Sequence, residues 1–351
     1  MIALSALGWD ASRDLELRTA FGRSASAARV VGLSRGSYSL ESDTVSGEAR
    51  LTGAFARAAR RPTDYPTVGD WVVIGGADGL RITSLLPRRN LISRKAAGTP
   101  TIEQPLAANV DRVLVVFSLE GGSARPPRAL ERYLALVRGS GAVPSILLNK
   151  ADLLMSSGDE QMCDVAERTS AGAPGAEVLV TSAVTGVGMD ALRSRLQPGT
   201  TALLLGPSGS GKSSLANELL GRESQSVGEV RASDLRGRHT TVRRELMLLE
   251  GGGLLIDSPG LREVGPWVEP DAIEEVFPEI AELAQGCRFR DCTHSGEPGC
   301  AVQSACADGT LDIRRLAAYI ELSRENRERA RSVIDRARRS REPNRRKRLR
   351  P

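Results

Sequence analysis

Apolar residues change their spacing near residue 111. Before it, short apolar segments recur about every ten residues between Gly, Ser, Pro and Asp, which is typical of strands in a small antiparallel barrel. A five-stranded oligonucleotide-binding (OB) barrel is one candidate, and an SH3-like barrel would give a similar pattern. The expected strands are residues 30–33, 36–40, 49–53 and 70–74.

From about residue 111 onward, apolar runs alternate with amphipathic segments whose apolar residues recur at helical spacing. This alternation is typical of a mostly parallel sheet covered by helices. The expected strands are residues 112–117, 143–148, 178–180, 201–205 and 254–256. The expected helices are residues 130–138, 161–169 and 189–196.

Beyond Pro266 no further strand is expected. Two helices, residues 272–283 and 311–339, flank a segment that is rich in Cys and His. A chain of 351 residues is long enough for two or three domains. We therefore predict a multidomain protein with a small β-barrel at 1–94, a central α/β domain at 95–265 and a helical C-terminal domain at 266–351.

The composition argues against membrane and secreted proteins. Hydrophobic residues make up 40% of the chain and charged residues 26%, which is the balance of a soluble globular protein. No run of eighteen apolar residues occurs, so no membrane-spanning helix is expected. The first thirty residues carry several charges and no continuous apolar segment, so no secretory signal is expected.

Basic residues concentrate at the C-terminus. From Glu321 onward there are thirteen Arg or Lys against five Asp or Glu, whereas the rest of the chain holds 35 against 38. Such a tail indicates either a polyanionic partner such as RNA or a solvated helix without a partner. A set of barrel arginines would likewise line a face for RNA or only raise solubility. These are Arg23, Arg29, Arg35, Arg57, Arg60 and Arg61.

One segment matches the phosphate-binding P-loop pattern at every fixed position. It follows the expected strand 201–205 and leads into a helical segment, 214–220. Its glycines let backbone N–H groups surround phosphate oxygens, and the helix N-terminus adds partial positive charge. Lys212 would reach the β- and γ-phosphates, and Ser213 would bind Mg²⁺. The segment is Gly206, Pro207, Ser208, Gly209, Ser210, Gly211, Lys212, Ser213 and Ser214.

Two further motifs indicate that the base is guanine. The carboxylate of Asp152 can accept hydrogen bonds from guanine N1–H and the 2-amino group, and adenine offers neither donor there. The stem of Lys150 can cover the base, and Asn149 can tie its loop to the P-loop. Backbone N–H groups of the second motif would bind guanine O6. The motifs are Asn149, Lys150, Ala151, Asp152 and Thr181, Ser182, Ala183, each directly after an expected strand.

Two segments would bind Mg²⁺ and the γ-phosphate. Asp257 would hold Mg²⁺ through water, and the N–H of Gly260 would contact the γ-phosphate. Residues 237–241 lie between the P-loop and Asp257, and either Thr240 or Thr241 would complete the Mg²⁺ shell. Which of the two threonines is the ligand stays open at this point.

The residue that orients the attacking water in Ras-like enzymes has no counterpart here. That residue is a glutamine directly after Asp-x-x-Gly, and Leu261 occupies the position. A leucine cannot hydrogen-bond water, so hydrolysis should be slow without help. His239 is one candidate for orienting water, a loop histidine with structural contacts is another reading, and a partner is equally able to supply the missing group.

The order of the motifs is unusual. Ordinary GTPases place the phosphate motifs before the base-reading motifs, whereas here the base-reading motifs come first. A parallel sheet can keep its core while the chain ends move to another loop, so we expect a circularly permuted GTPase domain. Its last switch leads directly into the C-terminal domain and would act on it. An ATP-dependent kinase or transport ATPase would use the same P-loop, but Asp152 argues against adenine.

Four of the five cysteines lie between residues 287 and 306, which fits a metal site in a reducing cytosol better than a disulfide framework. Three thiolates and one imidazole make a closed tetrahedral site, which favours structural Zn²⁺. Reduced cysteines in an irregular loop are the alternative. Cys306 is a rival fourth ligand, and Cys163 reads as an ordinary buried thiol. The expected ligands are Cys287, Cys292, His294 and Cys300.

With these motifs, the sequence resembles the ribosome small-subunit-dependent GTPase A family (RsgA, also called YjeQ) over nearly its whole length. The resemblance implies an OB-fold N-terminal domain, slow GTP hydrolysis stimulated by the small (30S) ribosomal subunit, and a role in late maturation of that subunit. It also implies GTP and GDP as ligands, 16S rRNA as a partner, Mg²⁺ and Zn²⁺ as cofactors, and a cytoplasmic monomer. The alternative is an RNA-binding protein with a regulatory or vestigial GTPase domain.

Overall fold

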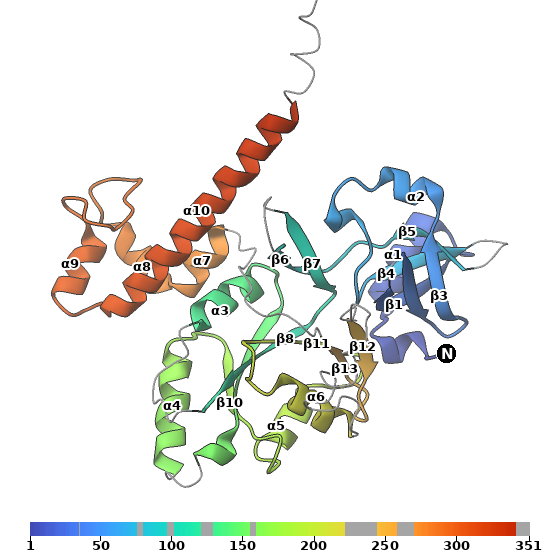
Figure 1. Ribbon diagram of the computed structural model, residues 1–351, viewed down its shortest axis with the longest axis horizontal. Helices are drawn as coiled ribbons and strands as arrows, with labels where there is room; N and C mark the ends of the chain where they lie inside the picture. The colour runs from blue at the N-terminus through green and yellow to red at the C-terminus, as the bar shows by residue number, and fades with distance from the viewer. Residues whose placement is uncertain are drawn as a thin grey trace, which may run out of the picture.

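The computed structural model describes residues 1–34, 36–75, 80–96, 102–120, 129–154, 159–221, 244–257 and 270–341. These residues form a barrel, an α/β unit and a helical C-terminal module (Figure 1). One eleven-stranded sheet runs through the first two, in the order β10-β9-β8-β11-β13-β12-β1-β2-β3-β5-β4. The predicted multidomain fold class is confirmed, while the residue boundaries given above for its domains stay predictions.

The N-terminal strands close into a barrel. Strand β1 pairs antiparallel with β2 and β4, β3 pairs parallel with β5, and β4 pairs antiparallel with β5. This closed 1-2-3-5-4 order is the topology of an OB-fold rather than of an SH3-like barrel. The strands are β1 (Ser26–Ser34), β2 (Ser37–Glu41), β3 (Ser46–Leu51), β4 (Trp71–Gly75) and β5 (Arg81–Leu85), with α1 (Ala11–Phe21) before them and α2 (Gly53–Ala58) after β3.

The α/β unit has the predicted parallel strands. Its sheet separates two layers of helices: α3 and α4 share a core with Val113 and Val115, whereas α5 and α6 pack with Leu114 and Val116. The strands are β8 (Arg112–Ser118), β9 (Val143–Asn149), β10 (Glu177–Val180), β11 (Thr201–Leu205) and β13 (Leu254–Asp257). The helices are α3 (Leu130–Arg138), α4 (Asp159–Ala171), α5 (Met189–Arg193) and α6 (Lys212–Leu220).

Four strands were not expected from the sequence. One is β5 of the barrel, and two form a separate hairpin, β6 (Leu91–Lys95) with β7 (Glu103–Ala108). The fourth, β12 (Glu245–Leu248), pairs antiparallel with β13 on one side and with β1 of the barrel on the other. Strand β12 therefore joins the barrel to the sheet of the α/β unit.

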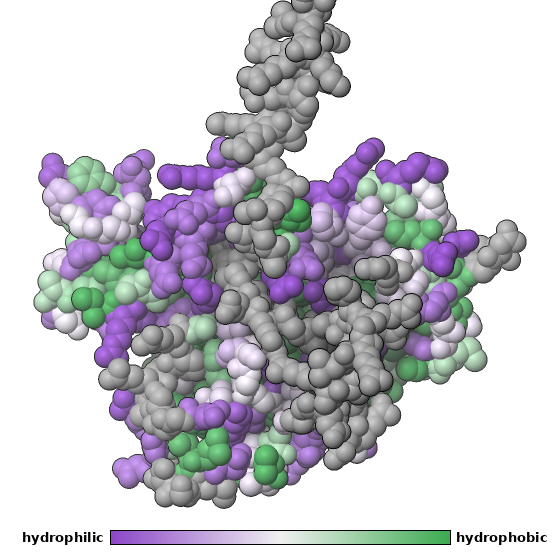
Figure 2. Space-filling view, viewed as in Figure 1, coloured by the Kyte–Doolittle hydropathy of each residue, from purple (hydrophilic) through white to green (hydrophobic). Residues whose placement is uncertain are grey.

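The C-terminal module contains α7 (Pro270–Val276), α8 (Pro278–Ala284), α9 (Ala301–Ala307) and α10 (Ile313–Arg341). The single helix predicted over residues 272–283 is two helices, because Pro278 removes a backbone donor and restricts the residue before it. Helix α10 is largely hydrophilic (Figure 2) and is joined to α3 by ion pairs such as Arg132 with Glu325. Among the helices that the structure describes, none has the length and apolar character needed to cross a bilayer.

Arg29 of β1 is buried between the barrel and the α/β unit, with 1% of its surface exposed. Its guanidinium donates to the carbonyls of Leu7, Gly69 and Asn109, and to Thr201 Oγ1 at 2.9 Å. Burial lowers the pKa of Arg29 to about 10, although the nearby charge of Asp111 acts in the opposite direction. The suggestion that Arg29 lines an RNA face is therefore wrong. Its side chain is buried, and it forms hydrogen bonds with both the barrel and the α/β unit.

We expect Arg29→Met to lower the free energy of unfolding by about 3 kcal/mol, because it leaves several buried acceptors without a donor. Urea unfolding followed by tryptophan fluorescence measures this directly, since Trp71 packs against the guanidinium. The matched control is Arg57→Met on the exposed side of α2, for which we expect a change within about 0.5 kcal/mol. Equal effects of the two substitutions would contradict the structural role of Arg29.

Candidate nucleotide and metal sites

The P-loop has the geometry that its sequence requires. It connects the end of β11 to the start of α6, and three of its glycines have positive φ: Gly206, Gly209 and Gly211. A Cβ atom on Gly206 would collide with the carbonyl of Val116, and one on Gly211 would collide with the side-chain amide of Asn149. Both positions thus need glycine for a backbone conformation and for a close approach.

Lys212 lies at the first position of α6 and folds back onto the loop. Its ammonium donates to the carbonyls of Gly206 at 2.9 Å and Pro207 at 2.6 Å, and lies 3.5 Å from Ser210 Oγ. Burial lowers the pKa of Lys212, and the charge of Asp257 partly opposes this. Phosphate oxygens placed in the loop would give this half-buried cation stronger acceptors than the carbonyls it uses here.

Asp257 ends β13, which pairs parallel with the P-loop strand β11. The carboxyl ends of parallel neighbours lie at one edge of a sheet, so Asp257 and the P-loop share that edge. Asp257 is buried, with 5% of its surface exposed. Ser213 follows Lys212 in the first turn of α6. The arrangement places a carboxylate and a hydroxyl near one loop, which suits an oxygen-liganded cation.

The base-reading motifs lie against the P-loop although they are distant from it in sequence. Asn149, at the end of β9, donates from Nδ2 to the carbonyl of Ser210 at 3.0 Å and accepts from Thr181 Oγ1 at 3.3 Å. The backbone N–H of Ala151 donates to the carbonyl of Thr181 at 3.1 Å. The expected tie between Asn149 and the P-loop is therefore present, and it also fixes the second motif.

The residues expected to read guanine are already held in place. The hydroxyl of Ser182 donates to Asp152 Oδ1 at 2.5 Å, which orients the carboxylate. Lys150 has a left-handed backbone, with φ of 67°. Its ammonium lies 2.8 Å from a carboxylate oxygen of Glu120. Ala183 follows Ser182 in the same loop. The two motifs thus meet at the sheet edge that also carries the P-loop.

Glu120 was not foreseen from the sequence. It follows β8 by two residues, and Leu119 donates from its backbone N–H to the carbonyl of Asn149 at 2.9 Å. The ion pair with Lys150 lowers the pKa of Glu120. The available signal was its position directly after a parallel strand, at the edge where the other site residues lie.

A cavity of about 1540 Å³ lies beside the P-loop. Its lining includes Ser208 of the P-loop, Glu120, and Arg314 and Arg315 of α10. Arg315 pairs with Glu131 of α3 at 3.6 Å, so the C-terminal module is held close to the nucleotide-binding edge.

The predicted switch residues lie outside the described part of the chain. These are His239, Thr240, Thr241, Gly260 and Leu261. Their roles stay predictions.

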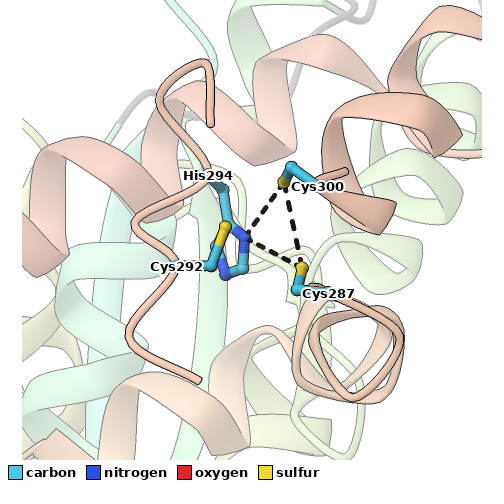
Figure 3. A group of neighbouring side chains, drawn as sticks. All are labelled: Cys287, Cys292, His294 and Cys300. Carbon is cyan, nitrogen blue, oxygen red and sulfur yellow. Dashed lines mark hydrogen bonds between the residues drawn. The ribbon is translucent and has the colours of Figure 1, made fainter. Parts of the chain in front are cut away.

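The predicted metal ligands converge in the C-terminal module (Figure 3). One ligand atom from each of Cys287, Cys292, His294 and Cys300 lies within 4.8 Å of all the others. The Sγ atoms of Cys287 and Cys300 are 3.9 Å apart, and His294 Nδ1 lies 3.6 Å and 3.4 Å from them. Metal–sulfur bonds of about 2.3 Å in a tetrahedron require sulfur separations of about 3.8 Å. The four residues therefore fit a tetrahedral metal ion.

Neighbouring groups fix the ligand loop. The carboxylate of Glu297 accepts hydrogen bonds from the backbone and hydroxyl of Thr293 and from the backbone of Ser295. These bonds, the Thr293 hydroxyl first, lower the pKa of Glu297 to about 2. Gln303 donates to the carbonyl of His294 at 2.6 Å. Such outer contacts orient metal ligands before the ion binds.

The other two cysteines are separate from this cluster. Cys306 does not belong to the group of four, so the structure favours Cys300 over its rival. Cys163 is exposed on α4, and the prediction of a buried thiol was wrong. The buried residues of that helix, Val165 and Thr169, define a core-facing side that does not include position 163.

Sequence comparison gives one consistent family. The family model described as RsgA GTPase matches residues 85–267. A protein of Opitutus terrae named small ribosomal subunit biogenesis GTPase RsgA is 41% identical over 345 residues, covering 95% of this chain and 92% of that protein. A protein of the same name from Streptomyces coelicolor is 42% identical over 327 residues, covering 92% and 87%.

Solved structures agree with this result. The crystal structure of YjeQ from Thermotoga maritima matches with a TM-score of 0.61 and 25% identity, covering 86% of this chain and 98% of that chain. The structure of YloQ, a circularly permuted GTPase, matches with a TM-score of 0.59 and 25% identity over 88% and 98%. The family model, the relatives and the motif order together show that this chain belongs to the RsgA GTPase family.

Proposed function

We propose that this protein hydrolyses GTP and assists the late maturation of the small ribosomal subunit. The observation that carries the proposal is the contact of the base-reading motifs with the P-loop. Asn149 binds the carbonyl of Ser210, and Ser182 orients Asp152 at the same sheet edge. A guanine nucleotide spans that edge, with its base at Asp152 and its phosphates at Lys212. The small ribosomal subunit enters the proposal because the relatives are named small ribosomal subunit biogenesis GTPases.

Each site residue has a role in this proposal. Lys212 would bind the β- and γ-phosphates, and Ser213 and Asp257 would help to hold Mg²⁺, which would neutralise phosphate charge. Thr240 or Thr241 would be a further Mg²⁺ ligand, and the N–H of Gly260 would contact the γ-phosphate. The burial of Asp257 and its position beside β11 support its part.

Hydrolysis is slow in the free protein under this proposal. Leu261 stands where Ras-like enzymes carry the water-orienting glutamine, so the attacking water needs another partner. His239 or a group of the ribosomal subunit supplies that partner. Binding of the subunit then raises the rate.

The metal ion of the C-terminal module is Zn²⁺ in this proposal. Three thiolates with one imidazole are soft and borderline donors that suit zinc, and four protein ligands leave no open position for catalysis. The ion is structural, because residues 285–300 contain no helix or strand to hold them.

In this proposal the protein acts as a monomer in the cytoplasm. It binds the small subunit through the 16S rRNA. Exposed arginines on the barrel and the hydrophilic α10 support contact with a polyanion. The names of the relatives support a ribosomal location.

GTP hydrolysis measured with and without isolated small subunits tests the proposal. We expect slow turnover alone and a clear rise in turnover when subunits are added. Lys212→Ala serves as the control, since it removes the phosphate-binding cation and should abolish both rates. Large ribosomal subunits should give no rise. A rate that small subunits leave unchanged would contradict the proposed function.

A further inference from the structure

Glu120 lies opposite Lys150 at the carboxyl edge of the parallel sheet. Strands β8 and β9 run parallel, and the last residues that pair are Ser118 and Asn149. The backbone N–H of Leu119 then donates to the carbonyl of Asn149 at 2.9 Å, and the N–H of Glu120 donates to Ser118 Oγ at 3.1 Å. Backbone contacts therefore fix Glu120 beside the first base-reading motif.

The two side chains form an ion pair. Lys150 Nζ lies 2.8 Å from Glu120 Oε2, and the side chains are 28% and 67% exposed respectively. The hydrogen bond from Lys150, together with its charge, lowers the pKa of Glu120. The carboxylate is therefore ionised at neutral pH, where it neutralises a cation that is largely covered by protein.

The stem of Lys150 lies along the P-loop. A Cβ atom on Gly211 would lie 3.9 Å from Lys150 Cε, and the left-handed backbone of Lys150 turns its side chain into this position. A free lysine side chain has many rotamers, and a ligand that packs on the stem has to remove that freedom. An ammonium that is already fixed reduces this entropic cost of binding.

We propose that Glu120 is a positioning residue for guanine binding, because its carboxylate holds Lys150 with the stem in place before the base packs on it. The proposal rests on the function proposed above and assigns this further residue to its nucleotide site. Glu120 acts at the base end of the site, whereas Lys212 binds at the phosphate end. Its contribution should therefore be the same for every guanine nucleotide, whatever its number of phosphates.

The opposite role makes a different prediction. A carboxylate that acted only by its charge would repel the phosphates of the ligand. Removal of the Glu120 charge would then strengthen binding, and the gain would grow from GMP to GDP to GTP. The sign of the effect and its dependence on phosphate number thus separate positioning from repulsion.

Displacement of a fluorescent GDP from the full-length protein by GMP, GDP and a non-hydrolysable GTP analogue tests the inference. For Glu120→Gln we expect about two- to fivefold weaker binding of all three, as for a partly exposed ion pair. The loss should shrink at about 1 M salt, where the Debye length is about 3 Å. A purely structural role would not give this salt dependence.

The matched control is Glu328→Gln on α10. Glu328 is also 67% exposed, and it pairs with Arg324 at 3.9 Å. The substitution removes the same charge from an equally exposed position outside the nucleotide site. All three affinities should therefore equal those of the wild type.

A second background tests whether Glu120 acts through Lys150. Lys150→Met keeps an apolar stem and removes the ammonium, so adding Glu120→Gln to it should cause no further loss of affinity. Glu120 is exposed, so the thermal unfolding midpoint of Glu120→Gln should stay close to that of the wild type.

The outcomes distinguish this inference from the proposed function. If Glu120→Gln binds all three nucleotides as tightly as the wild type, or more tightly with each added phosphate, the inference is wrong and the proposed function stands. If its effect is as large in the Lys150→Met background, Glu120 does not act through Lys150 and the inference is also wrong. If the wild type binds no guanine nucleotide, the proposed function fails and the inference fails with it.

Discussion

Asp152→Asn is expected to weaken GDP binding by at least about a hundredfold and to shift the preference of the site from guanine to xanthine. A carboxylate accepts from guanine N1–H and the 2-amino group, whereas an asparagine amide places its own N–H against one of these donors. Xanthine carries an oxygen in place of the 2-amino group, so it can accept from that amide. The hydroxyl of Ser182 can still donate to the oxygen of asparagine, so the loop should keep its shape.

Titration calorimetry with GDP, the xanthosine diphosphate and ADP measures this change. The matched control is Asp190→Asn, because that carboxylate is fully exposed on α5 and lies outside both base-reading motifs. Its nucleotide affinities should equal those of the wild type. Undiminished GDP binding by Asp152→Asn would show that the carboxylate points away from the base.

Cys300→Ser should remove the metal ion and unfold the ligand loop while leaving GDP binding intact. Structural zinc contributes roughly 10 kcal/mol or more to small modules, and the loop has little apolar core to replace that contribution. Cys300 also caps α9 by accepting from the N–H of Gln303 at 3.4 Å. A serine hydroxyl can make the same cap, so any loss of structure reports the missing ligand rather than the missing cap.

Metal content by elemental analysis and hydrogen exchange over α8 and α9 measure this loss. Two cysteine controls sharpen the result. Cys163→Ser removes the exposed thiol of α4 and should retain one metal ion per chain, and so should Cys306→Ser. If the Cys300→Ser variant kept its metal ion and the Cys306→Ser variant lost it, the fourth ligand would be Cys306 and not Cys300.

The parallel strands and α3 could be predicted because their sequence patterns are strong and local. The helix predicted at residues 130–138 has those bounds in the structure, since Leu130, Leu134 and Val137 repeat at helical spacing. Strand β12 could not be predicted in this way. Its four residues have a weak pattern, and their partners on β1 lie more than two hundred positions away.

Arg29 shows a second limit of sequence reasoning. Residues 27–30 of β1 are buried on both faces, because one face packs in the barrel and the other meets the α/β unit. An arginine in a short strand reads as a solvent-facing residue unless that second contact is known. Only the long-range contacts with Asn109 and Thr201 reveal that it is a buried donor.

The candidate site also has one part that the sequence predicts and one part that it does not. Motif spacing was enough to place the P-loop and the guanine-reading residues at one sheet edge, since parallel strands end together. It did not indicate that Glu120 pairs with Lys150, because the contact depends on side-chain direction in two separate loops.

The position of β12 has a consequence for how the chain folds during synthesis. All five barrel strands end by Leu85, so the barrel can close about 160 residues before Glu245 leaves the ribosome. Gly32 of β1 can pair with Glu245 of β12 only after Glu245 has been synthesised. Glu245 also pairs with Asp257 of β13. Contacts of such long sequence separation form slowly. The pairing of β1 with β12, which connects the barrel to the α/β unit, is thus among the last contacts to form. A nascent chain that ends before β12 has a complete barrel but no functional nucleotide site.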